Sequence, residues 1–219
     1  MDEIKLHKKR LFLIFATEME DLNLDIFNLL DKQPQPARGS MLVAKPTVED
    51  ICFKRSVSIL IDHEEEGGSM GFIFNKPIGY TLGEVMPDVE GAQDVPLYLG
   101  GPVATNQLFF LHTLGSTVIP DSLQVAPGVF FGGDFEAVKL LLASGEQVMG
   151  KVKFMVGYSG WAPGQLDEEV KRHDWAVLKQ NAAQLIFHEQ DDNTWNRAVA
   201  LFGEHYRMWS NWPTDVTMN

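Results

Sequence analysis

Residues 157–170 read GYSGWAPGQLDEEV, and this stretch joins an extended segment to an amphipathic one. The run Val152–Tyr158 leads into it and is rich in β-branched and aromatic residues, which is typical of a buried strand. Further on, Leu166 and Val170 have the spacing that places side chains on one face of a helix. The sequence therefore predicts a strand, a glycine-rich turn and a helix over residues 163–173.

The same turn is similar to the nucleophile elbow of hydrolases, which reads G-x-S-x-G between a strand and a helix. Gly157 and Ser159 match that pattern. Trp161 does not, because it occupies the position where a glycine lets the tight elbow close against the sheet. We therefore expect Ser159 to help turn the chain into the helix, and a hydrolytic site near Ser159 is the alternative.

Further strands are predicted from alternating apolar and polar residues. Apolar side chains alternate with polar ones through residues 53–62, and the glycine-containing turn 66–69 leads into the apolar run 70–74. The remaining predicted strands are Leu97–Leu99, Leu108–His112, Val129–Phe131 and Trp175–Leu178.

Two more helices have recognisable starts. Asp134 is a typical N-cap residue, and an apolar stripe follows it. Residues 191–193 offer several capping side chains before a second stripe, which is mostly aromatic. This second stripe consists of Trp195, Val199, Phe202, Tyr206 and Trp209. Such a regular aromatic stripe usually lies in the core.

The composition excludes several classes of function. The net charge of −12 over 219 residues disfavours nucleic-acid partners, because these are bound by clustered Lys and Arg. Cys52 is the only cysteine, which favours a reducing compartment and predicts a cytoplasmic protein. No apolar run approaches the roughly 20 residues that cross a bilayer, so no membrane association is predicted.

The chain is interpreted as an extension followed by one domain. Residues 1–38 form the N-terminal extension, in which Leu22 and Ile26 begin a short helical pattern that ends before Pro34. Residues 39–219 contain no repeat, low-complexity block or break in composition. They are predicted to be a single domain with a C-terminal helix and tail.

Neither a metal nor a cofactor is predicted. The six histidines are scattered, with no pair at helical ligand spacing, and the acidic run His63–Glu66 has the character of a solvated turn. Residues 145–151 read GEQVMGK, but this phosphate-loop pattern follows a helix instead of a strand and continues with Val152 in place of Ser or Thr.

The order of several motifs resembles that of the YqgE/AlgH family of bacterial proteins. The matching stretches are GSMLVAKP (39–46), FKRSVSILIDHEEEGGSMGFIFNKPIGYTLGEV (53–85), LYLGGPV (97–103), LHT (111–113), GGDFEAV (132–138) and GYSGWAPGQLDEEV (157–170).

The resemblance implies an α+β fold in which a bifurcated, mostly antiparallel sheet folds into a pseudo-barrel flanked by helices. In the family the position of Ser159 is often alanine, which argues against a catalytic serine. The family has no established biochemical function. Some members carry the label of transcriptional regulator, but this sequence shows no helix-turn-helix motif that would support DNA binding.

Two hypotheses of function follow from different classes. In the first, the protein is a non-catalytic cytosolic binding or regulatory protein whose partner is another protein. Trp161 and Trp212 are then candidate exposed anchors, since tryptophan is enriched at interface hot spots.

In the second hypothesis, polar side chains at strand ends and loops form a small-molecule site, which is hydrolytic in one version. His63, Asn75, His112 and Ser159 are the candidates, and this hypothesis requires them to converge within hydrogen-bond reach. The sequence makes no prediction about the oligomeric state.

Overall fold

The computed structural model describes residues 33–212 except 65, 147, 181 and 189–192. The helix predicted within residues 22–30 and the tail beyond residue 212 lie outside the described residues, as does most of the predicted extension. The division into residues 1–38 and 39–219 stays a prediction.

Ten strands form one mixed sheet that is mostly antiparallel. Along its main path the order is β10-β1-β2-β3-β9-β6-β8-β7, and β4 and β5 branch from it. The strands are β1 (Met41–Ala44), β2 (Val57–Glu64), β3 (Gly68–Ile73), β4 (Pro77–Thr81), β5 (Pro96–Leu99), β6 (Val103–His112), β7 (Leu123–Ala126), β8 (Val129–Phe131), β9 (Val152–Trp161) and β10 (Trp175–Leu178).

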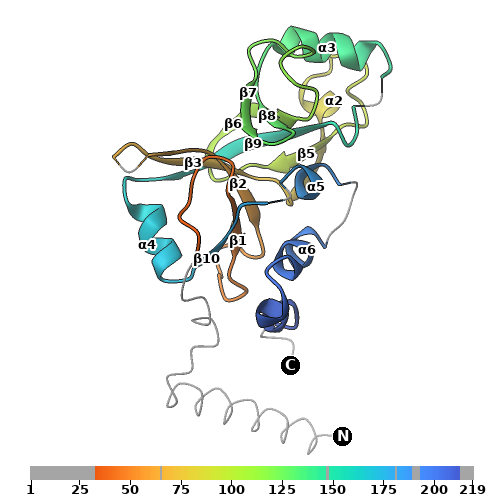
Figure 1. The fold of residues 1–219 in the computed structure, drawn as a ribbon. Coiled ribbons are helices and arrows are strands. Elements are labelled where there is room, and N and C mark those ends of the chain that lie inside the picture. Colours follow the sequence, from red (N-terminus) through yellow and green to blue (C-terminus); the bar gives the residue numbers. More distant parts are fainter. Residues whose placement is uncertain (1–32, 65, 147, 181, 189–192, 213–219) are drawn as a thin grey trace, which may run out of the picture.

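Strand β9 is the point where the sheet divides. Its first half pairs with β6 on one edge and in parallel with β5 on the other, with Phe154 opposite Leu97. Its last residues leave β5 and pair with β3, where Ser159 lies opposite Gly71. Figure 1 shows β9 running between the two parts of the fold. The expected bifurcation is therefore confirmed.

The sheet stays open, so the expected pseudo-barrel is incomplete. Strands β10 and β7 end the main path, and no backbone pairing joins them within the described part of the chain. Strand β7 instead packs against the segment just before β1, where a Cβ on Gly39 would lie 2.3 Å from the carbonyl oxygen of Val125. The α+β class with a mostly antiparallel sheet is confirmed.

Helices cover both parts of the sheet (Figure 1). They are α2 (Leu82–Val85), α3 (Phe135–Ala143), α4 (Gln165–Lys171), α5 (Ala182–Phe187), α6 (Thr194–Ala200) and α7 (Arg207–Ser210), with the 3-10 helix η1 (Glu204–Tyr206). Helices α2 and α3 pack on one apolar cluster with β5, β6 and β9, whereas α5, α6 and α7 pack on the largest cluster. Helix α4 covers a third cluster over β1, β2 and β10.

Most predicted elements exist with shifted ends. Asp134 caps α3, and its carboxylate accepts a hydrogen bond from the backbone N–H of Glu136. The predicted C-terminal helix is wrong as one element, because Gly203 adopts a φ of 88° and divides it into α6, η1 and α7. Its aromatic residues Trp195 and Trp209 are still buried in the core. Among the described residues, no helix is both long enough and apolar enough to span a bilayer.

Candidate functional site

Ser159 is a structural residue at the point where the two parts of the sheet meet. Its side chain is completely buried, and its hydroxyl donates a hydrogen bond to the carbonyl oxygen of Gly100 at 3.2 Å. The backbone around it is packed very closely, since a Cβ on Gly100 would lie 2.1 Å from the carbonyl oxygen of Gly157. The structure therefore argues against Ser159 as a nucleophile. It also corrects the expected role in the turn, because Ser159 lies within β9 and the turn into α4 begins only after Trp161.

Trp161 is not an exposed anchor, contrary to the sequence-based expectation. Only 6% of it is exposed, and its indole N–H donates to Oε2 of Glu169 at 2.9 Å. Trp175 donates to the same oxygen at 2.8 Å, while the side-chain amide of Gln165 donates to Oε1 at 2.8 Å. We call these four residues the Glu169 clamp. It joins β9, α4 and β10, so that one carboxylate fixes the strand and the helix of the motif GYSGWAPGQLDEEV to each other and to β10.

His112 lies at the opposite end of β9 from Ser159. It pairs with Val152, and Ser159 is seven residues further along β9, which corresponds to about 23 Å of strand. The ring of His112 is fully buried and stacks on Phe130, and its Nε2–H donates to the carbonyl oxygen of Gly132. Burial lowers the pKa of His112, and the hydrogen bond to Gly132 opposes that shift. The neutral ring is therefore a core group.

Asn75 holds two segments together instead of facing a ligand. Its side-chain oxygen accepts from the backbone N–H of Val57 at 2.7 Å, and its side-chain N–H donates to the carbonyl oxygen of Arg55 at 2.9 Å. His63, Asn75, His112 and Ser159 thus occupy different parts of the sheet. The predicted site built from these four residues does not assemble.

Trp212 lies at the end of the described chain and is half-buried. Its carbonyl oxygen accepts a hydrogen bond from the guanidinium of Arg55, which ties this end of the chain to the segment before β2. Because Trp161 is buried under α4, the two tryptophans do not form one exposed surface.

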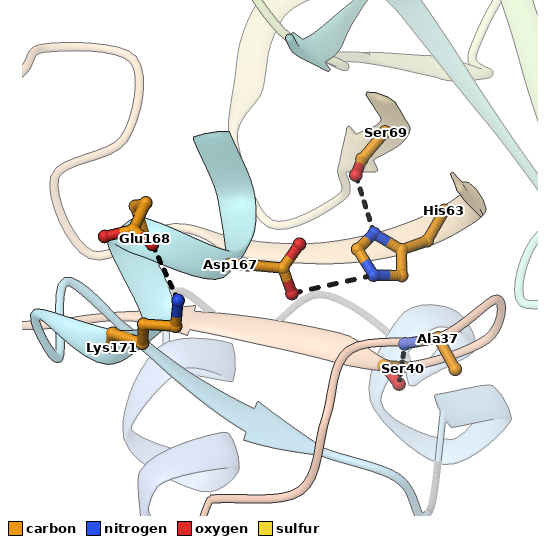
Figure 2. Close-up of polar contacts among 7 residues, drawn as sticks. All are labelled: Ala37, Ser40, His63, Ser69, Asp167, Glu168 and Lys171. Carbon is orange, nitrogen blue, oxygen red and sulfur yellow. Dashed lines mark hydrogen bonds and ion pairs between the residues drawn. The ribbon is translucent and has the colours of Figure 1, made fainter. Parts of the chain in front are cut away.

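His63 does have polar neighbours, but they are residues that the sequence did not single out (Figure 2). His63 and Ser69 face each other across the β2–β3 hairpin, with 2.7 Å between Nδ1 and the serine hydroxyl. On the other side of the ring, Nε2 is 3.8 Å from a carboxylate oxygen of Asp167 in α4. The position of Ser69 opposite His63 follows from hairpin pairing, whereas Asp167 comes from a distant helix. A Ser–His–Asp group therefore exists here, with a close serine and a distant carboxylate.

The outer edge of β10 carries an unusual contact. Gln33 places its side-chain amide on this edge, donating to the carbonyl oxygen of Trp175 at 3.1 Å and accepting from the N–H of Val177 at 2.8 Å. On the inner side, the backbone N–H of Lys45 donates to the carbonyl oxygen of Asp174, and β10 pairs with β1. One side chain thus makes the pair of hydrogen bonds that the backbone of a neighbouring strand would make.

Within residues 33–212, apart from the undescribed positions, no three His, Cys, Asp or Glu side chains are arranged to hold a metal ion.

Comparison with known proteins places the chain in a family. The family model described as AlgH-like matches residues 41–207. A UPF0301 protein of Parabacteroides distasonis is 40% identical over 195 residues, covering 89% of this chain and 98% of the relative. A UPF0301 protein of Bacteroides fragilis is 38% identical over 199 residues, covering 91% of this chain and 100% of the relative.

Two solved structures are similar in fold. The AlgH protein from Pseudomonas aeruginosa has a TM-score of 0.62 at 27% identity and covers 84% of this chain and 100% of its own. Protein DIP2367 from Corynebacterium diphtheriae has a TM-score of 0.69 at 23% identity and covers 85% of this chain and 97% of its own. On these matches, the chain belongs to the AlgH-like family of bacterial proteins.

Proposed function

We propose that this protein is a non-catalytic, cytoplasmic binding protein with a regulatory role, and that it receives an extended segment of a partner protein on the outer edge of β10. The observation that carries the proposal is the contact of Gln33 with Trp175 and Val177. A side-chain amide has one C=O and N–H donors, as a peptide group does, so it can imitate one residue of an added strand.

Strand addition suits this edge for two reasons. Main-chain hydrogen bonds supply affinity when an extended peptide joins a sheet, and alternate side chains supply specificity. Free edges are also a risk for unwanted pairing, and proteins commonly cover them with other parts of the chain. Gln33 is a small cover that a longer strand can displace, because it occupies only two backbone groups.

The proposal is tested by comparing the proteins that co-purify with three forms of the chain. Gln33→Ala removes the cover, so we expect at least one protein to be enriched several-fold over the wild type. Gln124→Ala is the matched control, because Gln124 is an exposed glutamine on β7 at the other end of the sheet path. Quantitative mass spectrometry measures the enrichment. Identical profiles for all three folded forms would contradict the proposal.

The Ser69–His63 pair favours a second candidate function, hydrolysis through an activated serine. The 2.7 Å contact is within the reach that proton transfer requires. The 3.8 Å separation between His63 and Asp167 is longer than the hydrogen bond that orients the histidine in a catalytic triad. We therefore give this candidate second place.

A fluorophosphonate probe separates the two candidates. Because the binding proposal assigns no reaction to Ser69, we expect the intact mass of the wild-type protein to stay unchanged after incubation with the probe. A single adduct on Ser69 that disappears in both Ser69→Ala and His63→Ala would establish an activated serine and overturn the non-catalytic assignment.

A further inference from the structure

Three basic side chains surround the start of β2 and the end of β3, in a protein whose net charge is −12. We call Arg55, Lys76 and Lys153 the basic corner. Lys76 donates from Nζ to the carbonyl oxygen of Lys54 at 2.6 Å, and Lys153 donates from Nζ to the carbonyl oxygen of Phe74 at 3.1 Å. The three cations are therefore attached to two short segments, 54–55 and 74–76, which the side chain of Asn75 holds together.

The surroundings of Lys153 are aromatic. Its ammonium nitrogen lies 4.2 Å from the centroid of the Tyr98 ring and 5.9 Å from that of Phe74. Arg55 has a similar environment, because its guanidinium carbon lies 4.6 Å from the centroid of the Trp195 ring. Aromatic faces stabilise a desolvated cation only partly, and they leave N–H donors without acceptors. The buried Nε of Arg55 is such a donor.

Among the described residues, Asp50 and Cys52 act electrostatically on Lys76, but no carboxylate forms an ion pair with any of the three cations. Desolvation lowers the pKa of Arg55 and is the largest cause of the lowered pKa of Lys76. It lowers the pKa of Lys153 to about 8. A desolvated charge normally has a partner of opposite sign, so the lack of an ion pair at Lys153 and Arg55 indicates a place for an external anion.

We propose that the basic corner binds the phosphate group of a small molecule, with Lys153 as the principal donor. A dianion matches several cations better than a monoanion does, and ammonium and guanidinium groups are the usual donors to phosphate oxygens. The partly exposed ring of Tyr98 offers an apolar surface for the rest of the ligand. The acidic protein repels long polyanions, so the ligand is a small phosphorylated compound instead of a nucleic acid.

Calorimetric titration with phenyl phosphate and with inorganic phosphate tests the proposal. We expect phenyl phosphate to bind the wild-type protein, and Lys153→Met to weaken that binding at least tenfold while keeping the side-chain length. Lys153→Arg keeps the charge and is expected to restore most of the affinity. Lys171→Met is the matched control, because Lys171 is exposed and pairs with Glu168. Equal affinity for inorganic phosphate would show that the site takes free phosphate.

The pH dependence of sulfate binding provides a second test of the proposal. Sulfate does not titrate near neutral pH, so a fall in its affinity between pH 7 and pH 9 reports the loss of the Lys153 proton. Tyr98 is the titratable group in contact with Lys153, and burial raises its pKa away from this range. We expect the slope to disappear in Lys153→Met. Absence of binding to the wild type at millimolar phenyl phosphate, or unchanged affinity in folded Lys153→Met, would overturn the proposal.

Discussion

Lys153 places a charge inside the protein at neutral pH. Its pKa is lowered to about 8 in the folded chain from the ordinary value of 10.5, because burial penalises the charged form. Each unit of pKa difference corresponds to about 1.4 kcal/mol, so the buried charge lowers the free energy of unfolding by roughly 3 kcal/mol below pH 8. The penalty decreases as the pH rises from 8 towards 10.5, because the unfolded chain then binds the extra proton.

This penalty leads to a prediction at the residue scale. Lys153→Met removes the charge, so we expect the free energy of unfolding at pH 7 to rise by about 2 kcal/mol, allowing for the lost hydrogen bond to Phe74. Urea unfolding at pH 7 and at pH 9.5 measures the effect, and the gain should be clearly smaller at the higher pH. A destabilised variant, or a gain that does not depend on pH, would contradict this view of Lys153.

At the scale of elements, the Glu169 clamp holds α4 on the sheet. One carboxylate accepts both indole N–H groups, and Trp161 and Trp175 are almost completely buried. Their donors would have no partner if the carboxylate were removed, and a buried donor without a partner costs about 1–3 kcal/mol. The helix is short, so this anchor contributes much of its attachment.

We therefore expect Glu169→Ala to lower the free energy of unfolding by about 2–4 kcal/mol. Glu168→Ala is the matched control on the same helix. Glu168 is exposed and pairs with Lys171, so its loss should change stability far less than the loss of Glu169. Parallel urea titrations compare the two variants. Equal effects would mean that the clamp does not hold α4.

Several strands and helices could be predicted from the sequence for a physical reason. Periodicity and caps are local, so the strands within 70–74 and 152–158 and the helix after Asp134 were predicted near their observed positions. The break at Gly203 was missed because the aromatic stripe continues through it with core-facing side chains. Strands β1, β4 and β7 are short and carry little periodicity of their own.

At the scale of the whole molecule, most contacts of the candidate site could not be predicted from the sequence. His63 was recognised, but its neighbour Asp167 reaches it only through the packing of α4. The small-molecule hypothesis required Ser159 and His112 to converge, whereas Ser159 lies near the end of β9 and His112 pairs with its first residue. The contact between Gln33 and β10 joins residues more than 140 positions apart, and no local pattern predicts such a pairing.

The most direct test of the central claim is photo-crosslinking at the edge of β10. A photoreactive amino acid replaces the exposed Lys179, next to β10, and the same substitution at the exposed Leu140 on α3 is the control. We predict that position 179 captures a partner protein through one extended segment, more efficiently when Gln33 is alanine, and that position 140 does not capture this protein. No adduct at position 179, or the same adducts at both positions, would contradict the account.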